Sequence, residues 1–138
     1  MLQQFPAIIA RPPRRATMST IEVSARMTIR EGKLEGFKRQ AAEIIRQTKE
    51  KDTKTLRYDW FLNRDKTECE VREVYESSEG LIEHRMHIGD ALNTLFHEFA
   101  DGHAVTIYGE PSPRLVELAN AHKDVSIKWY SFLRGLDS

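Results

Sequence analysis

Apolar and polar residues alternate with a period of two where the patterned part of the chain begins. The stretch "STIEVSARMTI", starting at Ser19, predicts a strand with one apolar face, formed by Ile21, Val23, Ala25, Met27 and Ile29. After the turn "REGK", apolar residues recur at helical spacing across residues 33–51, with charged residues between them. A strand followed by an amphipathic helix is therefore expected.

The middle of the chain predicts a hairpin and a long helix. "TLRYDWFLN" and "CEVREVYE" alternate in the same way and are joined by a short polar segment, which is typical of a β-hairpin. The helix that follows is expected to begin at a serine N-cap, Ser77 or Ser78. A glycine and an aspartate at residues 89–90 are expected to break or kink it.

The last third of the chain predicts two more strands and a short helix. "ADGHA" predicts a turn, "AVTIYGE" a fourth strand and "DVSIKWYSFL" a final strand. Between these strands, Ser112 as cap and Pro113 at the first helical position mark the short helix. The core of this order, β-α-β-β-α-β, is the ferredoxin-like split βαβ unit of the α+β class, an antiparallel sheet with helices on one face.

The helix-free face of such a sheet needs an explanation, because helices cover only one face. Tyr58 and Trp60 lie on one side of their strand and Phe61 lies on the other, so both faces carry bulky groups. A partly apolar face is usually buried, and twofold dimers are the commonest closed assembly. We therefore expect a homodimer; a solvated face with scattered aromatic residues is the alternative.

Composition and charge indicate which classes of binding partner the protein is not expected to have. The chain has 138 residues, enough for one domain with a core, and its 21 Lys and Arg balance 21 Asp and Glu. A neutral chain has no long-range field to attract nucleic acid or an anionic membrane, and no apolar run is long enough to span a bilayer. The single cysteine, Cys69, excludes an intrachain disulfide and favours a reducing, cytoplasmic location. We expect it to be a small core residue rather than a reactive thiol.

Residues 1–18, "MLQQFPAIIARPPRRATM", differ from the rest of the chain. Their prolines prevent long regular structure, and their arginines form a basic cluster. An arginine-rich segment without acidic residues is compatible with an organellar transit peptide. We expect instead a disordered or extended tail, followed by a single domain over residues 19–138.

Four stretches resemble the antibiotic biosynthesis monooxygenase domain, and within it the small quinol monooxygenases. They are "IEVSARMTIREGKLEGFKRQAAEI", "TLRYDWFLNRD", "CEVREVYESSEGLIEH" and "AVTIYGEPSPRL". The sharpest element is a glutamate at a strand end, an aromatic residue two positions on, a serine cap and a helical histidine, here Glu73, Tyr75, Ser77 and His84. The resemblance spans about Ser19 to Leu136. It implies a dimeric α+β barrel with a pocket between sheet and helices in each subunit, and oxygenation of a small quinol or polycyclic phenol by O2 without metal or flavin.

The site residues expected for that chemistry are a base, hydrogen-bond donors and aromatic walls, because the site must stabilise a deprotonated substrate and exclude water. His84 is the expected base, since a neutral imidazole accepts a proton near neutral pH, and Trp60 offers an indole N–H. The alternative for His84 is a histidine at the rim of the pocket that only forms structural hydrogen bonds. The other residues expected to contact substrate are Tyr58, Tyr75, Met27, Glu73 and Asn63. For the aromatic residues plain packing is the alternative, and for Asn63 a role in the turn.

The roles of the remaining histidines and arginines are not fixed by the sequence. His84 and His87 lie three positions apart, but no further ligand has metal-site spacing, so no metal is expected. His87 and Arg85 are expected to face water. Arginines at positions 26, 57 and 72 are possible anion stabilisers, although alternation alone does not assign them to a face of the sheet.

Three functions are compatible with these residues. The first is the cofactor-independent monooxygenase, the second is a non-catalytic dimeric module that binds a small ligand or a partner protein, and the third is an isomerase or lyase that consumes no oxygen. Haem degradation on the same fold is disfavoured. Those enzymes are expected to carry an asparagine and a tryptophan where this chain has Ala25 and Tyr75.

Overall fold

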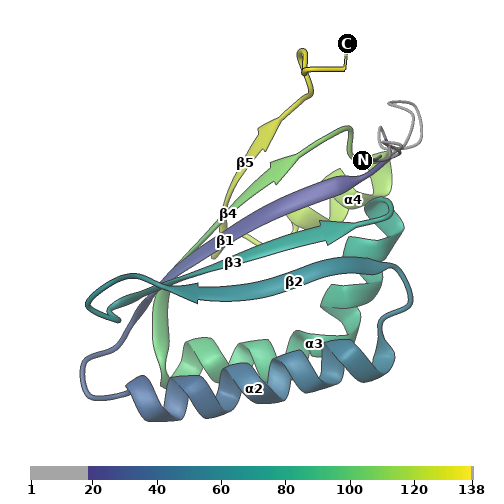
Figure 1. The fold of residues 1–138 in the computed structure, drawn as a ribbon. Helices are drawn as coiled ribbons and strands as arrows, with labels where there is room; N and C mark the ends of the chain where they lie inside the picture. The colour runs from purple at the N-terminus through teal and green to yellow at the C-terminus, as the bar shows by residue number, and fades with distance from the viewer. Residues whose placement is uncertain (1–18, 138) are drawn as a thin grey trace, which may run out of the picture.

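The computed structural model describes residues 19–137, which form a five-stranded sheet with helices against one face (Figure 1). In chain order the elements are β1 (Ile21–Ile29), α2 (Leu34–Lys51), β2 (Thr55–Leu62), β3 (Glu68–Tyr75), α3 (Ser78–Glu98), β4 (Ala100–Tyr108), α4 (Pro113–Asn120) and β5 (Ser126–Tyr130). The α+β class and the ferredoxin-like order are confirmed. The tail expected over residues 1–18 lies outside the described residues.

The sheet has the order β2-β3-β1-β4-β5, with β1 at its centre. Each pair of neighbours among the first four strands is antiparallel, whereas β5 pairs parallel with β4. The expectation of a wholly antiparallel sheet is therefore wrong at β5. The reason is α4, which supplies the crossover that brings the chain back in the same direction.

The boundaries around α3 and β4 differ from the sequence prediction. α3 is continuous rather than broken at residues 89–90, although it changes direction along its length (Figure 1). The segment expected to be a turn, "ADGHA", is the start of β4, where the register against β1 shifts between Arg26 and Thr28. Gly102 has φ +70° there, a left-handed conformation that glycine adopts without steric cost. No helix among residues 19–137 is long and apolar enough to cross a membrane.

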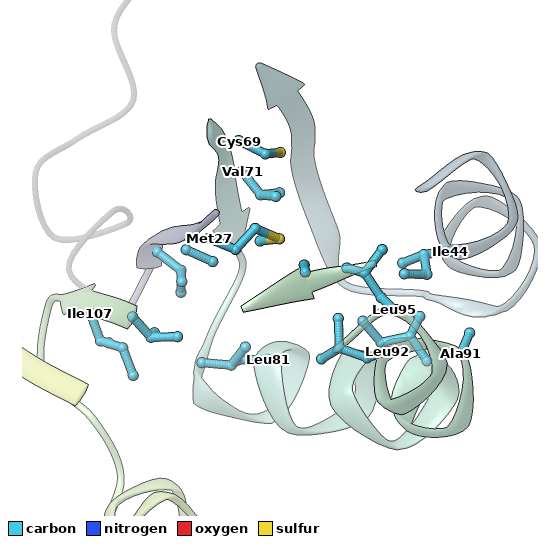
Figure 2. Close-up of a cluster of buried hydrophobic side chains, with 14 of the residues drawn as sticks. Met27, Ile44, Cys69, Val71, Leu81, Ala91, Leu92, Leu95 and Ile107 are labelled. Carbon is cyan, nitrogen blue, oxygen red and sulfur yellow. The ribbon is translucent and has the colours of Figure 1, made fainter. Parts of the chain in front are cut away.

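The core lies between the sheet and the helices. In Figure 2, Met27, Cys69 and Val71 project from the sheet on the side where Leu92 and Leu95 of α3 pack. Cys69 is 2% exposed, and burial raises the pKa of its thiol to about 12. A thiol so rarely ionised is a poor nucleophile, so the prediction of a core cysteine is confirmed.

The helix-free face is polar at its centre. The Ser24 hydroxyl donates to the Glu70 carboxylate, and Arg26 donates to Ser24 Oγ at 3.1 Å. Aromatic groups lie only toward the two edges, where Phe61 is 48% exposed on β2 and Tyr130 is 53% exposed on β5. The apolar part of this face, expected from the sequence, is therefore confined to the edges of the sheet, and the homodimer stays a prediction.

Candidate functional site

A cavity of about 280 Å³ lies between the inner face of the sheet and the helices α3 and α4. Most of its wall is apolar, contributed by β1, β4, α3 and α4, and the polar groups come chiefly from β2, β3 and α3. The residues predicted from the sequence that line it are Met27, Tyr58, Trp60, Glu73 and His84. Two other predicted residues, Tyr75 and Asn63, do not line this cavity.

His84 is the buried polar centre of the wall. Its side chain is 1% exposed, and its Nδ1 lies 2.8 Å from Oδ2 of Asp52, a residue that caps the C-terminal end of α2. Because an ionised carboxylate only accepts hydrogen bonds, Nδ1 carries the hydrogen in this pair. The other ring nitrogen, Nε2, is then the proton acceptor of the neutral imidazole.

Asp52 is a buried carboxylate held by three donors. Its second oxygen, Oδ1, lies 2.7 Å from Nδ1 of His87, and Thr55 Oγ1 donates to Oδ2 at 2.6 Å. Burial raises the pKa of Asp52, but the hydrogen bonds from His84, His87 and Thr55 outweigh that effect and lower it to about 2. Asp52 therefore remains charged near neutral pH and holds both imidazole rings in place.

The structure corrects the prediction for His87 and adds Asp52. His87 is not fully exposed: its side chain is 28% exposed and is bonded to Asp52. In the sequence, Asp52 lies in the polar run "KEKDTK" at the end of the helix predicted over residues 33–51. The one local sign of this cluster in the sequence was the pair of histidines on one face of α3, whose ring N–H groups need a hydrogen-bond acceptor. That acceptor, Asp52, lies 32 residues from His84 in the sequence, so sequence spacing alone does not identify it.

Glu73 and Tyr75 form a second buried pair beside His84. The Tyr75 hydroxyl donates to Glu73 Oε1 at 2.5 Å, and the Tyr75 ring centre lies 5.4 Å from that of His84. Burial raises the pKa of Glu73, which favours its protonated form. Tyr75 is fully buried, is not among the residues that line the cavity, and holds Glu73 in position, so its contact with substrate stays a prediction.

Trp60 presents an unsatisfied donor in the cavity wall. Its ring packs against Phe37 and edge-on against Tyr58, each with ring centres 6.0 Å apart. Its indole Nε1 is buried without a hydrogen-bond partner among the described residues. A buried donor left unpaired costs about 1–3 kcal/mol.

Asn63 stabilises the turn between β2 and β3, which was the alternative to a substrate-binding role. Its Oδ1 accepts hydrogen bonds from the backbone N–H groups of Thr67 and Glu68, each at 2.9 Å. It closes the β2–β3 turn and is exposed. Asn63 is not among the residues that line the cavity, and its contact with substrate stays a prediction.

The arginines also differ from expectation. Arg26, Arg57 and Arg72 lie on the helix-free face, where Arg26 is opposite Glu70 and Arg72 is opposite Asp59. None of the three reaches the cavity. Arg85, expected to face water, lines it instead. No group of three or more His, Cys, Asp or Glu side chains within residues 19–137 is arranged to hold a metal ion.

Comparison with known proteins identifies the fold. No family model matches the chain, and no curated protein sequence matches it significantly. Among solved structures, MupZ from Pseudomonas fluorescens is 25% identical with a TM-score of 0.71, over 86% of this chain and 94% of that one. The structure named "Putative antibiotic biosynthesis monooxygenase from Nitrosomonas europaea" is 19% identical with a TM-score of 0.60, over 69% and 93% of the two chains.

A third similar structure carries the same kind of name. The one described as a "putative antibiotic biosynthesis monooxygenase from Caulobacter crescentus" is 16% identical with a TM-score of 0.61, over 72% of this chain and 96% of that one. The resemblance inferred from the sequence is confirmed at the level of fold: the chain has the fold of these antibiotic biosynthesis monooxygenase structures. Fold alone does not assign a reaction, which has to come from the site.

Proposed function

We propose that the chain is a cofactor-independent monooxygenase that oxidises a small quinol or polycyclic phenol with O2. The observation that carries this proposal is the Asp52–His84 pair, whose imidazole lines an apolar cavity with Nδ1 committed to a carboxylate at 2.8 Å. That arrangement leaves Nε2 as a base for a phenolic hydroxyl. The similar structures named as monooxygenases support the reaction class.

The proposed reaction balances without a reductant. His84 takes the hydroxyl proton of a hydroquinone, and the electron-rich anion that remains reduces O2 in the cavity. One oxygen atom enters a ring C–H bond, and the other leaves as water with two hydrogen atoms of the substrate, so the product is a hydroxyquinone. The substrate supplies all four electrons, and no metal or flavin takes part.

The other cavity residues have definite roles in this proposal. Trp60 donates its unpaired N–H to the substrate oxygen that becomes anionic, and Glu73 offers a carboxyl biased toward its protonated form as a second donor. Tyr58 and Met27 form apolar walls that exclude water. Since a cavity of roughly 150 Å³ can accept benzene, a volume of about 280 Å³ suits a one- or two-ring substrate.

The assembly we propose is a homodimer in the cytoplasm. The support is the exposed apolar surface near the β5 edge, where Tyr130 stacks on Tyr108 with ring centres 5.7 Å apart and Leu133 is 95% exposed. A second subunit on this edge would bury it. Size-exclusion chromatography with light scattering tests this, and a monomer at high concentration contradicts it.

A second candidate reaction is proton transfer without oxygen, as in an isomerase or lyase. The same Asp52–His84 pair favours it, because a buried base beside a donor such as Glu73 moves protons whether or not O2 is present. A binding module without catalysis is the remaining alternative. In that case Trp60 and Glu73 would orient a ligand that leaves unchanged.

The deciding experiment measures O2 consumption with a panel of hydroquinones and naphthohydroquinones, after chelation and without flavin. We expect oxygen-dependent turnover that falls about 10²–10⁴-fold in His84→Ala and is unchanged in His97→Ala. His97 is the matched control because it lies on the same helix and is exposed. Turnover without O2 uptake would favour the isomerase or lyase. Equal rates in the wild type and His84→Ala would remove the proposal.

A further inference from the structure

Several arginines of this structure form ion pairs with a carboxylate, but Arg85 does not. It follows His84 on α3, is half-buried and lines the cavity. Among residues 19–137, no carboxylate lies within ion-pair distance of its guanidinium, and the guanidinium makes no hydrogen bond. Arg114, which lines the same cavity, is already bonded to Glu79 at 2.8 Å. Arg85 is thus a fixed charge with open donors in the cavity wall.

A second, more polar cavity of about 450 Å³ adjoins the first. The two share five wall residues, namely Arg85, Leu92, His103, His122 and Val125. The first cavity is apolar around His84, and the second adds Asn93 and the polar start of β4. Arg85 therefore lies where an apolar compartment meets a polar one.

The groups around Arg85 suit an anionic ligand. His103 stacks on Phe96 with ring centres 4.3 Å apart, and burial, with Arg85 nearby, lowers the pKa of His103 to about 4. His103 is therefore neutral near pH 7 and adds hydrogen-bonding capacity without charge. Of the two aspartates on the wall, Asp101 pairs with Arg30 at 3.1 Å, and Asp124 is not within ion-pair distance of Arg85.

We propose that Arg85 is the anchor for a substrate carboxylate, so that the substrate class is a phenol or quinol that also carries a carboxylate group, rather than an uncharged one. The planar guanidinium binds a carboxylate through two parallel hydrogen bonds, a geometry that lysine cannot reproduce. Because Asp124 weakens the local positive potential, this bidentate fit, more than net charge, gives the selectivity. The ring system then lies in the apolar cavity between His84 and Trp60.

Identifying this ligand as the substrate rests on the proposed function, but the anion site itself can be tested by binding alone. The probes are 1-naphthoate and 1-naphthamide, which have nearly the same shape and differ in charge, titrated calorimetrically into the full-length protein. We expect naphthoate affinity to fall about 10- to 100-fold in Arg85→Gln, with Arg85→Lys recovering only part of it. Naphthamide affinity should change less than about twofold in both variants.

Arg114→Gln is the matched control, since it removes the same charge from the wall of the same cavity. It should change naphthoate affinity much less than Arg85→Gln does. The proposal is overturned if the two variants lose affinity equally, if the wild type binds the amide as tightly as the acid, or if it binds neither. Arg85-dependent binding without oxygen consumption would instead remove the monooxygenase proposal and leave the anion site standing.

A phosphate group is the other anion that could occupy the site. Adding 1-naphthyl phosphate to the titration distinguishes the two. Our proposal predicts that the carboxylate binds at least as tightly as the phosphate ester, and a clear preference for the phosphate would contradict it.

Discussion

Asp52 and His84 are 32 residues apart in the sequence, and their side chains meet at 2.8 Å in a buried site. The two side chains are 2% and 1% exposed, so water does not compete for the hydrogen bond between them. The contact exists because α2 ends where α3 passes it. It fixes the tautomer and orientation of the imidazole that lines the cavity.

Replacing Asp52 by asparagine should disable the base while leaving the shape of the site nearly intact. An amide can donate to Nδ1 as well as accept from it, so the imidazole is no longer held with its hydrogen on Nδ1. We expect kcat/KM to fall by about 10²-fold or more. The control is Asp59→Asn, which removes an exposed carboxylate bonded to Arg57 on the helix-free face. A loss of similar size in both variants would rule out a specific role for Asp52.

Asp52 should also set part of the stability in acid. Its pKa is lowered to about 2 in the folded protein from the ordinary aspartate value of 3.8, so its contribution is fully present above about pH 4 and is lost as the pH falls through about 2. The contribution is about 2 kcal/mol. Urea unfolding between pH 2 and 5 should show a steeper loss for the wild type than for Asp52→Asn. Parallel pH profiles for the two proteins would contradict this assignment.

Trp60→Phe separates packing from hydrogen bonding in the cavity wall. The variant loses packing area but also removes a buried donor that has no partner among the described residues. These effects oppose each other, so the free energy of unfolding should stay within about 1 kcal/mol of the wild type. Affinity for a phenol or naphthol should fall several-fold because the acceptor oxygen loses its donor. Unchanged affinity would show that the indole N–H does not meet the ligand.

Two helical glycines should respond in opposite directions to alanine. A Cβ at Gly36 of α2 would collide with Phe99 Cε1, whereas a Cβ at Gly89 of α3 would meet nothing within 4 Å. Gly36→Ala should therefore destabilise the fold by about 1–3 kcal/mol, and Gly89→Ala should stabilise it by up to about 1 kcal/mol through helix propensity. Thermal and urea unfolding of both variants measure this. A stabilised Gly36→Ala protein would show that α2 and Phe99 do not pack as closely as described.

Local patterning predicted the elements well because each depends on residues near one another in the chain. The alternation in β1, β2 and β3 and the Ser112 cap, whose Oγ accepts from the Leu115 N–H at 3.1 Å, are cases of this kind. The secondary-structure predictions were wrong where a short segment is compatible with two local structures. The "ADGHA" segment contains turn-forming residues, yet it pairs with β1 and so forms the first part of β4.

The site was only partly predictable for a related reason. His84, Trp60 and Tyr58 stood out as residue types suited to the chemistry, and the fold brings them to one cavity. Asp52 and Arg85 did not stand out, because a charged residue at a helix end or on a helix face is usually solvated. Only tertiary packing shows that one is buried against two histidines and the other lines the cavity.

The tautomer of His84 decides whether Asp52 holds this imidazole as a base, and long-range ¹H–¹⁵N correlation spectra of the imidazole groups near neutral pH measure it. We expect hydrogen on Nδ1 and an unprotonated Nε2, with the Nε2 resonance shifting when a naphthol is added. The same spectrum of Asp52→Asn should show loss of that fixed tautomer. Hydrogen on Nε2 in the wild-type protein, or an Nε2 resonance indifferent to ligand, would contradict a base held by Asp52 and directed at the cavity.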